Sequence, residues 1–316
     1  MTTAVSVRRV KSRSRTKHHQ RESLSTMPAG SYILGTIRLL LFLIMALVVG
    51  GSQAIVLAIP PLRRSHEHVM PMLFHALACK IFGIEIEVTG MAHDQHPVLF
   101  VANHSSYIDI PVLGSIVPGC FIAKAEVADW PMFGTLAKLQ RTIFVHRKRE
   151  DVDNQRASMV DRVADGLDLI LFPEGTSSDG IGVLPFKSSL FSIASMALGS
   201  AEQRKQLTVQ PVAIACNHLD GLPLGRDMRH VYSWYGDMDL FPHLWRLGCL
   251  GHTTVTVAFL DPIPASGINR KRLAKQAEDA VRSAIDDMNA GLPVPGYQGP
   301  DAPPAPEPED ATAQAA

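Results

Sequence analysis

The feature that most constrains this chain is a long apolar run without a charge, LLLFLIMALVVGGSQAIVLAI, from Leu39 to Ile59. A helix of about 20 apolar residues is long enough to cross the hydrocarbon core of a bilayer. The run therefore predicts one spanning helix, or a membrane-embedded hairpin or half-inserted helix that bends near Gly50-Gly51. A signal peptide fits poorly, because the leader is long and the run exceeds an ordinary signal core. The remaining alternative is a buried helix of a soluble protein.

The charged residues are segregated along the chain, although the formal net charge of the 316 residues is zero. The leader carries one acid, Glu22, against a cluster of bases: Arg8, Arg9, Lys11, Arg13, Arg15, Lys17 and Arg21. A basic arm beside an apolar anchor favours contact with anionic lipid and a cytoplasmic N-terminus. The arm has no interleaved aromatic residues, so we do not expect it to bind nucleic acid.

Short apolar strands alternate with helical segments after residue 83, and hydrophobic residues make up 46% of the chain, enough for a sizeable core. Continuous apolar runs and period-two alternation predict strands at 84–88, 97–103, 120–124, 142–146, 167–173, 207–215 and 253–260. Helices are expected around 111–116 and at 154–166, 190–198 and 270–290. This order predicts an α/β fold: a mainly parallel sheet flanked by helices and preceded by a membrane-associated helix or helical hairpin.

The chain divides into four parts by composition. We expect a disordered basic arm at 1–30, a membrane-anchoring helical segment at 31–82, an α/β domain at 83–292 and a disordered Pro/acid tail at 293–316. The chain has four scattered cysteines without CxxC spacing: Cys79, Cys120, Cys216 and Cys249. That pattern argues against a disulfide framework and against a zinc site, so no metal is expected.

A histidine and an aspartate follow the strand at 97–103, in the stretch NHSSYID. Pro111 is best tolerated in the first turn of a helix, so a helix should begin near Ile110 with Asp109 at or close to its N-cap. The preceding loop can then fold back and bring His104 to Asp109. Such a pair can act as a base and its orienting carboxylate, at the carboxyl end of a strand where α/β sheets bind ligands.

Three further stretches carry polar residues at strand ends. FPEGTSS (172–178) places Glu174, Gly175 and Thr176 directly after a buried strand. RTIFVHR ends in Arg147, whose guanidinium suits a phosphate group. VQPVAI contains Pro211 inside a strand, which predicts an edge or bulge position.

These four stretches, in this order, resemble the blocks of the glycerolipid acyltransferase family, H-x4-D, G-x-x-F-[IV]-x-R, F-P-E-G-T-R-S and V-P-[IV]. The resemblance covers about residues 70 to 265. Two positions depart from the pattern: the glycine that opens the second block is Arg141, and the arginine of the third block is Ser177. In the family these blocks are associated with the phosphate of the acceptor, so its anion is left to Lys124, Arg141 and Arg147.

A narrower resemblance concerns 121–147, 172–180 and 234–245, which are similar to the lyso-ornithine lipid O-acyltransferase branch of bacteria. The acceptor of that branch carries no phosphate, which agrees with the loss of an arginine at Ser177. The resemblance thus implies lyso-ornithine lipid and/or 1-acyl-sn-glycerol-3-phosphate as the acceptor.

The reaction that the resemblance implies is the attack of a lysolipid hydroxyl on a fatty acyl thioester, carried by acyl carrier protein or coenzyme A. His104 would be the general base, and Asp109 would set its tautomer. The substrate-binding residues would be Lys124, Arg147, Glu174, Gly175 and Thr176. No cofactor is expected, and the enzyme would lie on the cytoplasmic side of a bacterial inner membrane.

Two other functions remain open from the residues. One is an acyl hydrolase that uses the same dyad with water in place of the lipid hydroxyl, although no nucleophile motif supports it. The other is a non-catalytic lipid-binding or scaffold member of the family, against which the intact His104, Asp109 and FPEGT stretch argue.

Overall fold

The computed structural model describes residues 30–145, 168–191 and 208–299. These residues contain one sheet with the order β1-β8-β6-β2-β5-β3-β4, in which β7 and β9 also pair with β6. The strands are β1 (Ile84–Thr89), β2 (Val98–Ala102), β3 (Gly119–Lys124), β4 (Ile143–Val145), β5 (Asp168–Leu171), β6 (Thr208–Leu219), β7 (Leu222–Pro223), β8 (Thr253–Phe259) and β9 (Ile263–Pro264). The helix expected at 154–166 and most of the one expected at 190–198 lie outside the described residues.

The sheet is mainly parallel, as the alternating pattern predicted. Strand β6 pairs with β2, β2 with β5, β5 with β3, and β3 with β4, and these pairings are parallel. The pairing of β1 with β8 is also parallel. The pairing of β6 with β8 is antiparallel. The predicted fold class, a mainly parallel sheet flanked by helices, is therefore confirmed.

Pro211 was predicted at an edge or bulge position. It occupies a central strand, so the edge position was wrong. It lies between Val209, which pairs with β9, and Val212, which pairs with β8. Its carbonyl accepts a hydrogen bond of 3.0 Å from the N–H of Leu260. The missing N–H falls in the gap between the two antiparallel partners, where little ladder pairing is lost.

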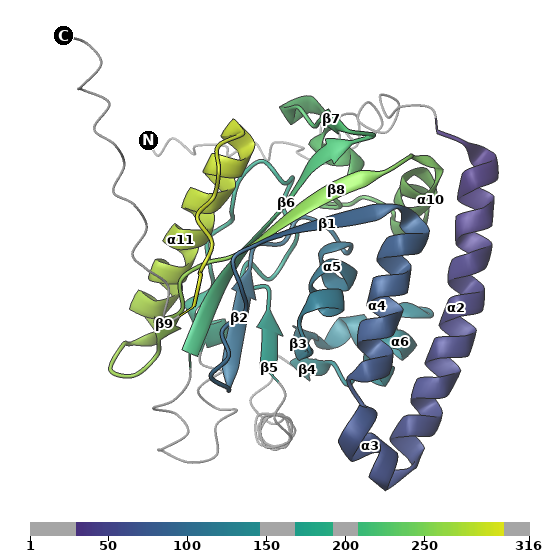
Figure 1. Ribbon diagram of the computed structural model, residues 1–316, viewed down its shortest axis with the longest axis horizontal. Helices are drawn as coiled ribbons and strands as arrows, with labels where there is room; N and C mark the ends of the chain where they lie inside the picture. Colours follow the sequence, from purple (N-terminus) through teal and green to yellow (C-terminus); the bar gives the residue numbers. More distant parts are fainter. Residues whose placement is uncertain (1–29, 146–167, 192–207, 300–316) are drawn as a thin grey trace, which may run out of the picture.

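Both faces of the sheet are buried, which explains why its strands read as continuous apolar runs. Leu99 and Val101 of β2 point into a core that includes helix α11 (Arg270–Ala290). Val98, Phe100 and Ala102 point into the other core, with residues of α2 (Tyr32–Ala58), α4 (Val69–Phe82), α5 (Asp109–Ile116) and α10 (Leu240–Cys249). Figure 1 shows α11 on one side of the sheet, and α4, α5 and the outermost α2 on the other.

Helix α2, which contains the long apolar run, is attached to the domain at both ends of its buried face. The guanidinium of Arg38 donates to the carbonyls of Gly248, Leu250 and Gly251, at 3.2, 2.5 and 2.9 Å. Five residues from the other end, the amide of Gln53 donates to two backbone carbonyls, that of Glu67 between α3 and α4 and that of Leu139 at the end of α6 (Phe133–Leu139). Helix α3 (Pro60–His66) joins α2 to α4.

The opposite face of α2 is apolar and exposed. Leu40 and Leu47 are 55% and 78% exposed, and the same side carries further large apolar side chains: Tyr32, Ile33, Ile37, Leu41, Ile44, Val48 and Ile55. The helix is long and apolar enough to cross a membrane, but a third of its most apolar window is buried against the domain. The hairpin expected to bend near Gly50-Gly51 is absent, since α2 continues unbroken to Ala58.

The tail predicted from Pro293 begins with residues that are bonded to the sheet. The N–H of Tyr297 donates to the carbonyl of Phe259 at 2.8 Å, and its carbonyl accepts from the N–H of Met91 at 2.9 Å. The start of the tail is thus placed beside the ends of β1 and β8. Residues from 300 onward lie outside the described residues.

Candidate active site

His104 and Asp109 lie together in the loop and first helical turn that follow β2. The Nδ1 atom of His104 is 2.9 Å from Oδ2 of Asp109. Helix α5 begins at Asp109 itself, with Ile108 as its N-cap, so Asp109 is the first helical residue and not the cap. The loop folds back as predicted and brings His104 to Asp109, and the helix begins one residue earlier than expected.

The carboxylate of Asp109 is fully buried and is met by four donors. Its Oδ2 accepts from the N–H groups of Ser105 and Ser106, at 2.7 and 2.9 Å, in addition to His104. Its Oδ1 accepts a 2.8 Å hydrogen bond from the hydroxyl of Tyr232. Burial, together with the charge of Asp109, raises the pKa of Tyr232 well above its ordinary value, so this hydroxyl keeps its proton and acts as a donor. Full satisfaction of this kind is what a buried charge requires.

The contact with Asp109 determines which nitrogen of His104 can take a proton. A carboxylate accepts, so Nδ1 carries the hydrogen and Nε2 has the lone pair. The ring stacks on Phe172, with centroids 4.1 Å apart, and its side chain is 18% exposed. Within the described ranges no hydrogen bond occupies Nε2, so this atom can accept a proton from a hydroxyl placed beside it.

The third block lies beside the His104 loop because the strands are in register. Val101 of β2 and Ile122 of β3 both align with Leu171 of β5, so the segments that follow emerge at one edge of the sheet. Glu174 Oε1 accepts from the N–H of His104 at 3.1 Å. The N–H of Ser178 donates to the carbonyl of His104 at 2.8 Å. The third block therefore holds the backbone of His104 from both sides.

Glu174 has a role in the protein interior. Glu174 is 1% exposed, and this burial raises the pKa of its carboxyl group to about 8. The nearby charge of Asp109 also raises this pKa, whereas the hydrogen bond from the N–H of His104 lowers it. Glu174 was expected to bind substrate, and a contact that the described residues show for it is with the backbone N–H of His104. Gly175 has a φ of +65°, and the Nζ atom of Lys187 lies close above it. Thr176 is exposed at the surface.

Three cations were expected to meet the anionic group of the acceptor: Lys124, Arg141 and Arg147. Lys124 is exposed at the end of β3, on the same edge of the sheet as His104. Arg147 lies outside the described residues. Arg141 forms an ion pair with the buried Glu67, so the expectation that it meets an anionic substrate is not supported. Arg141 has a φ of +60°, a conformation that favours glycine and accounts for a glycine in the family pattern.

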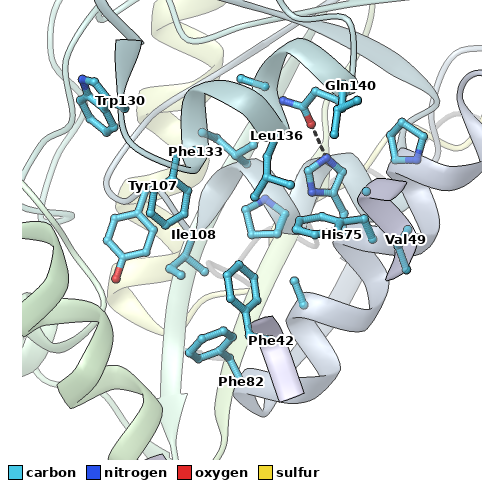
Figure 2. Close-up of a pocket in the computed structure, with 18 of the residues that line it drawn as sticks. Phe42, Val49, His75, Phe82, Tyr107, Ile108, Trp130, Phe133, Leu136 and Gln140 are labelled. Atoms are coloured by element: carbon cyan, nitrogen blue, oxygen red, sulfur yellow. Dashed lines mark hydrogen bonds between the residues drawn. The ribbon is translucent and has the colours of Figure 1, made fainter. Parts of the chain in front are cut away.

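An apolar cavity adjoins the start of α5. It contains about 1110 Å³ of empty space, counting its open side, and is lined by residues of α2, α4, α5, α6 and α10. Figure 2 shows Tyr107 and Trp130 at one end, and Val49, His75 and Gln140 at the other. The Nε2 atom of His75 is 2.7 Å from the side-chain oxygen of Gln140, and burial lowers the pKa of His75 to about 4. The lining thus presents almost only hydrocarbon.

Comparisons with known proteins agree with this geometry. A family model described as Acyltransferase matches residues 84–215. A lyso-ornithine lipid O-acyltransferase of Brucella abortus is 38% identical over 268 residues, covering 83% of this chain and 99% of the relative. A 1-acyl-sn-glycerol-3-phosphate acyltransferase of Neisseria gonorrhoeae is 30% identical over 216 residues, covering 67% of this chain and 78% of the relative.

The chain belongs to the acyltransferase family. This confirms the resemblance based on the four blocks. The solved structure of the 1-acyl-sn-glycerophosphate acyltransferase from Thermotoga maritima shares its fold, with a TM-score of 0.57 at 21% identity, covering 81% of this chain and 95% of that one. Within residues 30–145, 168–191 and 208–299 of this acyltransferase, no group of three or more His, Cys, Asp or Glu side chains could hold a metal ion.

Three features of the site escaped the sequence reasoning. These are the hydroxyl of Tyr232, the N–H donors of Ser105 and Ser106, and the apolar cavity. Tyr232 lies 123 residues from Asp109 in the chain, outside all four family blocks. A motif with fixed spacing cannot reveal a contact between two such distant positions. The contact forms because β8 pairs antiparallel with β6, and the segment between these two strands carries Tyr232 to Asp109.

The raised pKa of Glu174 predicts a pH-dependent stability. Its native pKa of about 8 exceeds the ordinary 4.5, so the stabilisation linked to this proton is present below pH 4.5 and is lost as the pH rises through 8. Glu174→Gln lacks this loss. We expect the difference in melting temperature between Glu174→Gln and wild type to rise by at least about 2–4 °C from pH 5 to pH 9.

The measurement is thermal unfolding of both proteins in a series of buffers. Glu85→Gln, on the exposed side of edge strand β1, is the matched control and should follow wild type at each pH. A constant difference between Glu174→Gln and wild type across the series would show that Glu174 is ionised in the native protein.

Proposed function

We propose that this acyltransferase transfers a fatty acyl group from a thioester to the hydroxyl of a lysolipid. The observation that carries the proposal is the 2.9 Å contact of His104 with Asp109, which leaves Nε2 available as a base at the carboxyl edge of the sheet. The relatives named above are lysolipid acyltransferases, and the Brucella protein is matched over nearly its whole length.

The chemistry that this geometry supports is a direct transfer. The lipid hydroxyl loses its proton to Nε2 of His104 as its oxygen forms a bond to the thioester carbonyl carbon. The carbon–sulfur bond then breaks, and the thiolate takes the proton from the imidazolium, which Asp109 stabilises. The N–H groups of Thr176 and Ser177 make no hydrogen bond within the described part of the chain, and they are our candidates for donors to the tetrahedral oxyanion.

The apolar cavity is the proposed site of an acyl chain. A hydrocarbon chain requires apolar surface and no hydrogen bonds, which matches the lining. Tyr107 and Ile108, which border the cavity, belong to the same loop as His104, so a chain bound there would place its carbonyl end near the dyad.

The acceptor that the site favours is lyso-ornithine lipid, with 1-acyl-sn-glycerol-3-phosphate as the second candidate. Two observations reduce the charge available for a phosphate. The third block has Ser177 in place of arginine, and Arg141 is paired with Glu67. The thioester donor is proposed to be acyl carrier protein or coenzyme A.

The same proposal places the enzyme on one leaflet of the membrane. A spanning α2 would have to draw Arg38 and its bonded carbonyls into the bilayer, because the helix is attached to the domain along its buried face. Lying in the interface with its exposed apolar face in the lipid avoids that cost. We propose the cytoplasmic face of a bacterial inner membrane, where thioester donors are made.

The function is tested by supplying labelled acyl-carrier protein and, separately, the two acceptors to membranes that contain the enzyme. We expect acylated ornithine lipid, and a loss of at least about 1,000-fold in rate for His104→Ala, because the base is removed. Phosphatidate as the main product would instead identify a phospholipid enzyme. Equal, background-level product from wild type and His104→Ala would contradict the proposal and favour a non-catalytic lipid-binding protein.

The membrane position is tested by charging the exposed face of α2. Leu40→Glu/Leu47→Glu should weaken binding to phosphatidylglycerol vesicles by at least about 10-fold, since two side chains no longer bury apolar area in lipid. Leu292→Glu, at an exposed position of 56% beyond α11 on the other side of the sheet, is the matched control. Vesicle co-sedimentation measures both, and equal binding of the two variants would show that α2 is not the contact surface.

A further inference from the structure

We infer that Tyr232 is a positioning residue of the reaction, which holds Asp109 in the orientation that His104 needs. The inference rests on the proposed function, since it concerns the same dyad. The hydroxyl of Tyr232 donates to Oδ1 of Asp109 at 2.8 Å, while His104 and two backbone N–H groups donate to Oδ2. Tyr232 and Asp109 are 1% and 0% exposed, so water does not replace this bond.

The two oxygens of Asp109 have different surroundings, and this asymmetry defines the role of Tyr232. Oδ2 is fixed by groups within the same loop, which could rotate with it as one unit. Oδ1 is bonded to a residue 123 positions away. The Tyr232 hydroxyl is thus the contact that fixes the plane of the carboxylate relative to the rest of the domain, and through it the direction of the imidazole.

The segment that carries Tyr232 is itself attached to both catalytic loops. The N–H of Trp234 donates to the carbonyl of Ser105 at 2.8 Å. Ser233 packs against Gly180, where any side chain would meet its hydroxyl. Arg229, in the short helix Arg226–Val231, donates to the carbonyl of Cys216 on β6 at 3.0 Å. The Tyr232 hydroxyl is therefore held by contacts on either side of it in the chain.

In the described residues, two further titratable groups interact with the charge of Asp109. Burial raises the pKa of Glu174 and that of the Cys216 thiol, and the charge of Asp109 adds to both shifts. Neither donates a hydrogen bond to the carboxylate in the described residues. Removal of the Tyr232 hydroxyl would leave Oδ1 buried without a hydrogen-bond donor, which is costly in free energy. The carboxylate would then rotate so that Oδ1 shares the donors that now bind Oδ2.

The experiment compares Tyr232→Phe with Tyr235→Phe in the full-length, detergent-purified enzyme. Tyr235 is three residues away, and its hydroxyl makes no bond to Asp109. We expect Tyr232→Phe to lower kcat by about 10- to 100-fold with KM for both substrates within twofold of wild type. Tyr235→Phe should retain the wild-type kcat, and both variants should keep the wild-type fold by circular dichroism.

A double-mutant cycle separates a positioning role from a general structural one. If Tyr232 acts through Asp109, Tyr232→Phe should change the residual rate of Asp109→Asn by less than twofold. A full additional loss in that background, or a kcat of Tyr232→Phe within twofold of wild type, would overturn the inference.

One readout does not depend on turnover, so failure of the proposed function and failure of this inference are distinguishable. The proton between His104 Nδ1 and Asp109 should give a downfield NMR signal that is absent in His104→Gln. We expect it to shift in Tyr232→Phe and to stay in place in Tyr235→Phe. An unshifted signal overturns the inference whether or not the wild type acylates a lysolipid. If Tyr232→Phe does not fold, fluorotyrosine at position 232 replaces it. This residue keeps the hydroxyl but makes it more acidic, and the same NMR signal should again shift.

Discussion

The site depends on the burial of one negative charge. The carboxylate of Asp109 is removed from water, and such a group is tolerated only when each of its oxygens has donors. The donors come from the loop after β2 and from the segment before α10, and the third block in turn holds the backbone of His104. The requirements of this single charge thus connect three regions that are far apart in the sequence. They fix the imidazole through Nδ1 and leave Nε2 as the nitrogen that can accept a proton.

The apolar N-terminal helices and the site belong to one packed unit. Helices α2, α4 and α5 share a core with one face of the sheet, and α5 begins with Asp109. The same helices line the apolar cavity, so a lipid-bound α2 would hold the cavity near the lipid surface. The proposed reaction, with a lipid acceptor and a soluble thioester donor, needs one surface that meets lipid and one that meets water. Arg38 serves this arrangement by tying the apolar helix to the domain.

Sequence patterns predicted the parts that depend on local periodicity. Helix α11 has the bounds that its periodicity predicted, and the His104–Asp109 contact follows from a strand end and a helix start five residues apart. The position of Pro211 was misjudged because its strand pairs with β8 and β9, which lie about 40 to 50 residues further along the chain. The gap between these two partners cannot be read from the residues around Pro211. Tyr232 and the cavity were missed for the same reason, since both arise from packing between elements. Arg141 was assigned to an anion because its buried partner, Glu67, lies on another element.

The most direct test of the account asks whether the acyl group passes from thioester to lipid in one step with His104 as base. Purified enzyme would be mixed with acyl thioester, with and without lysolipid, while thiol release and intact protein mass are followed. The account predicts that thiol is released only with lysolipid, in a 1:1 ratio to acylated lipid, and that the protein mass stays unchanged. A protein that gains the mass of an acyl group, or that releases thiol at the same rate without lysolipid, would contradict it.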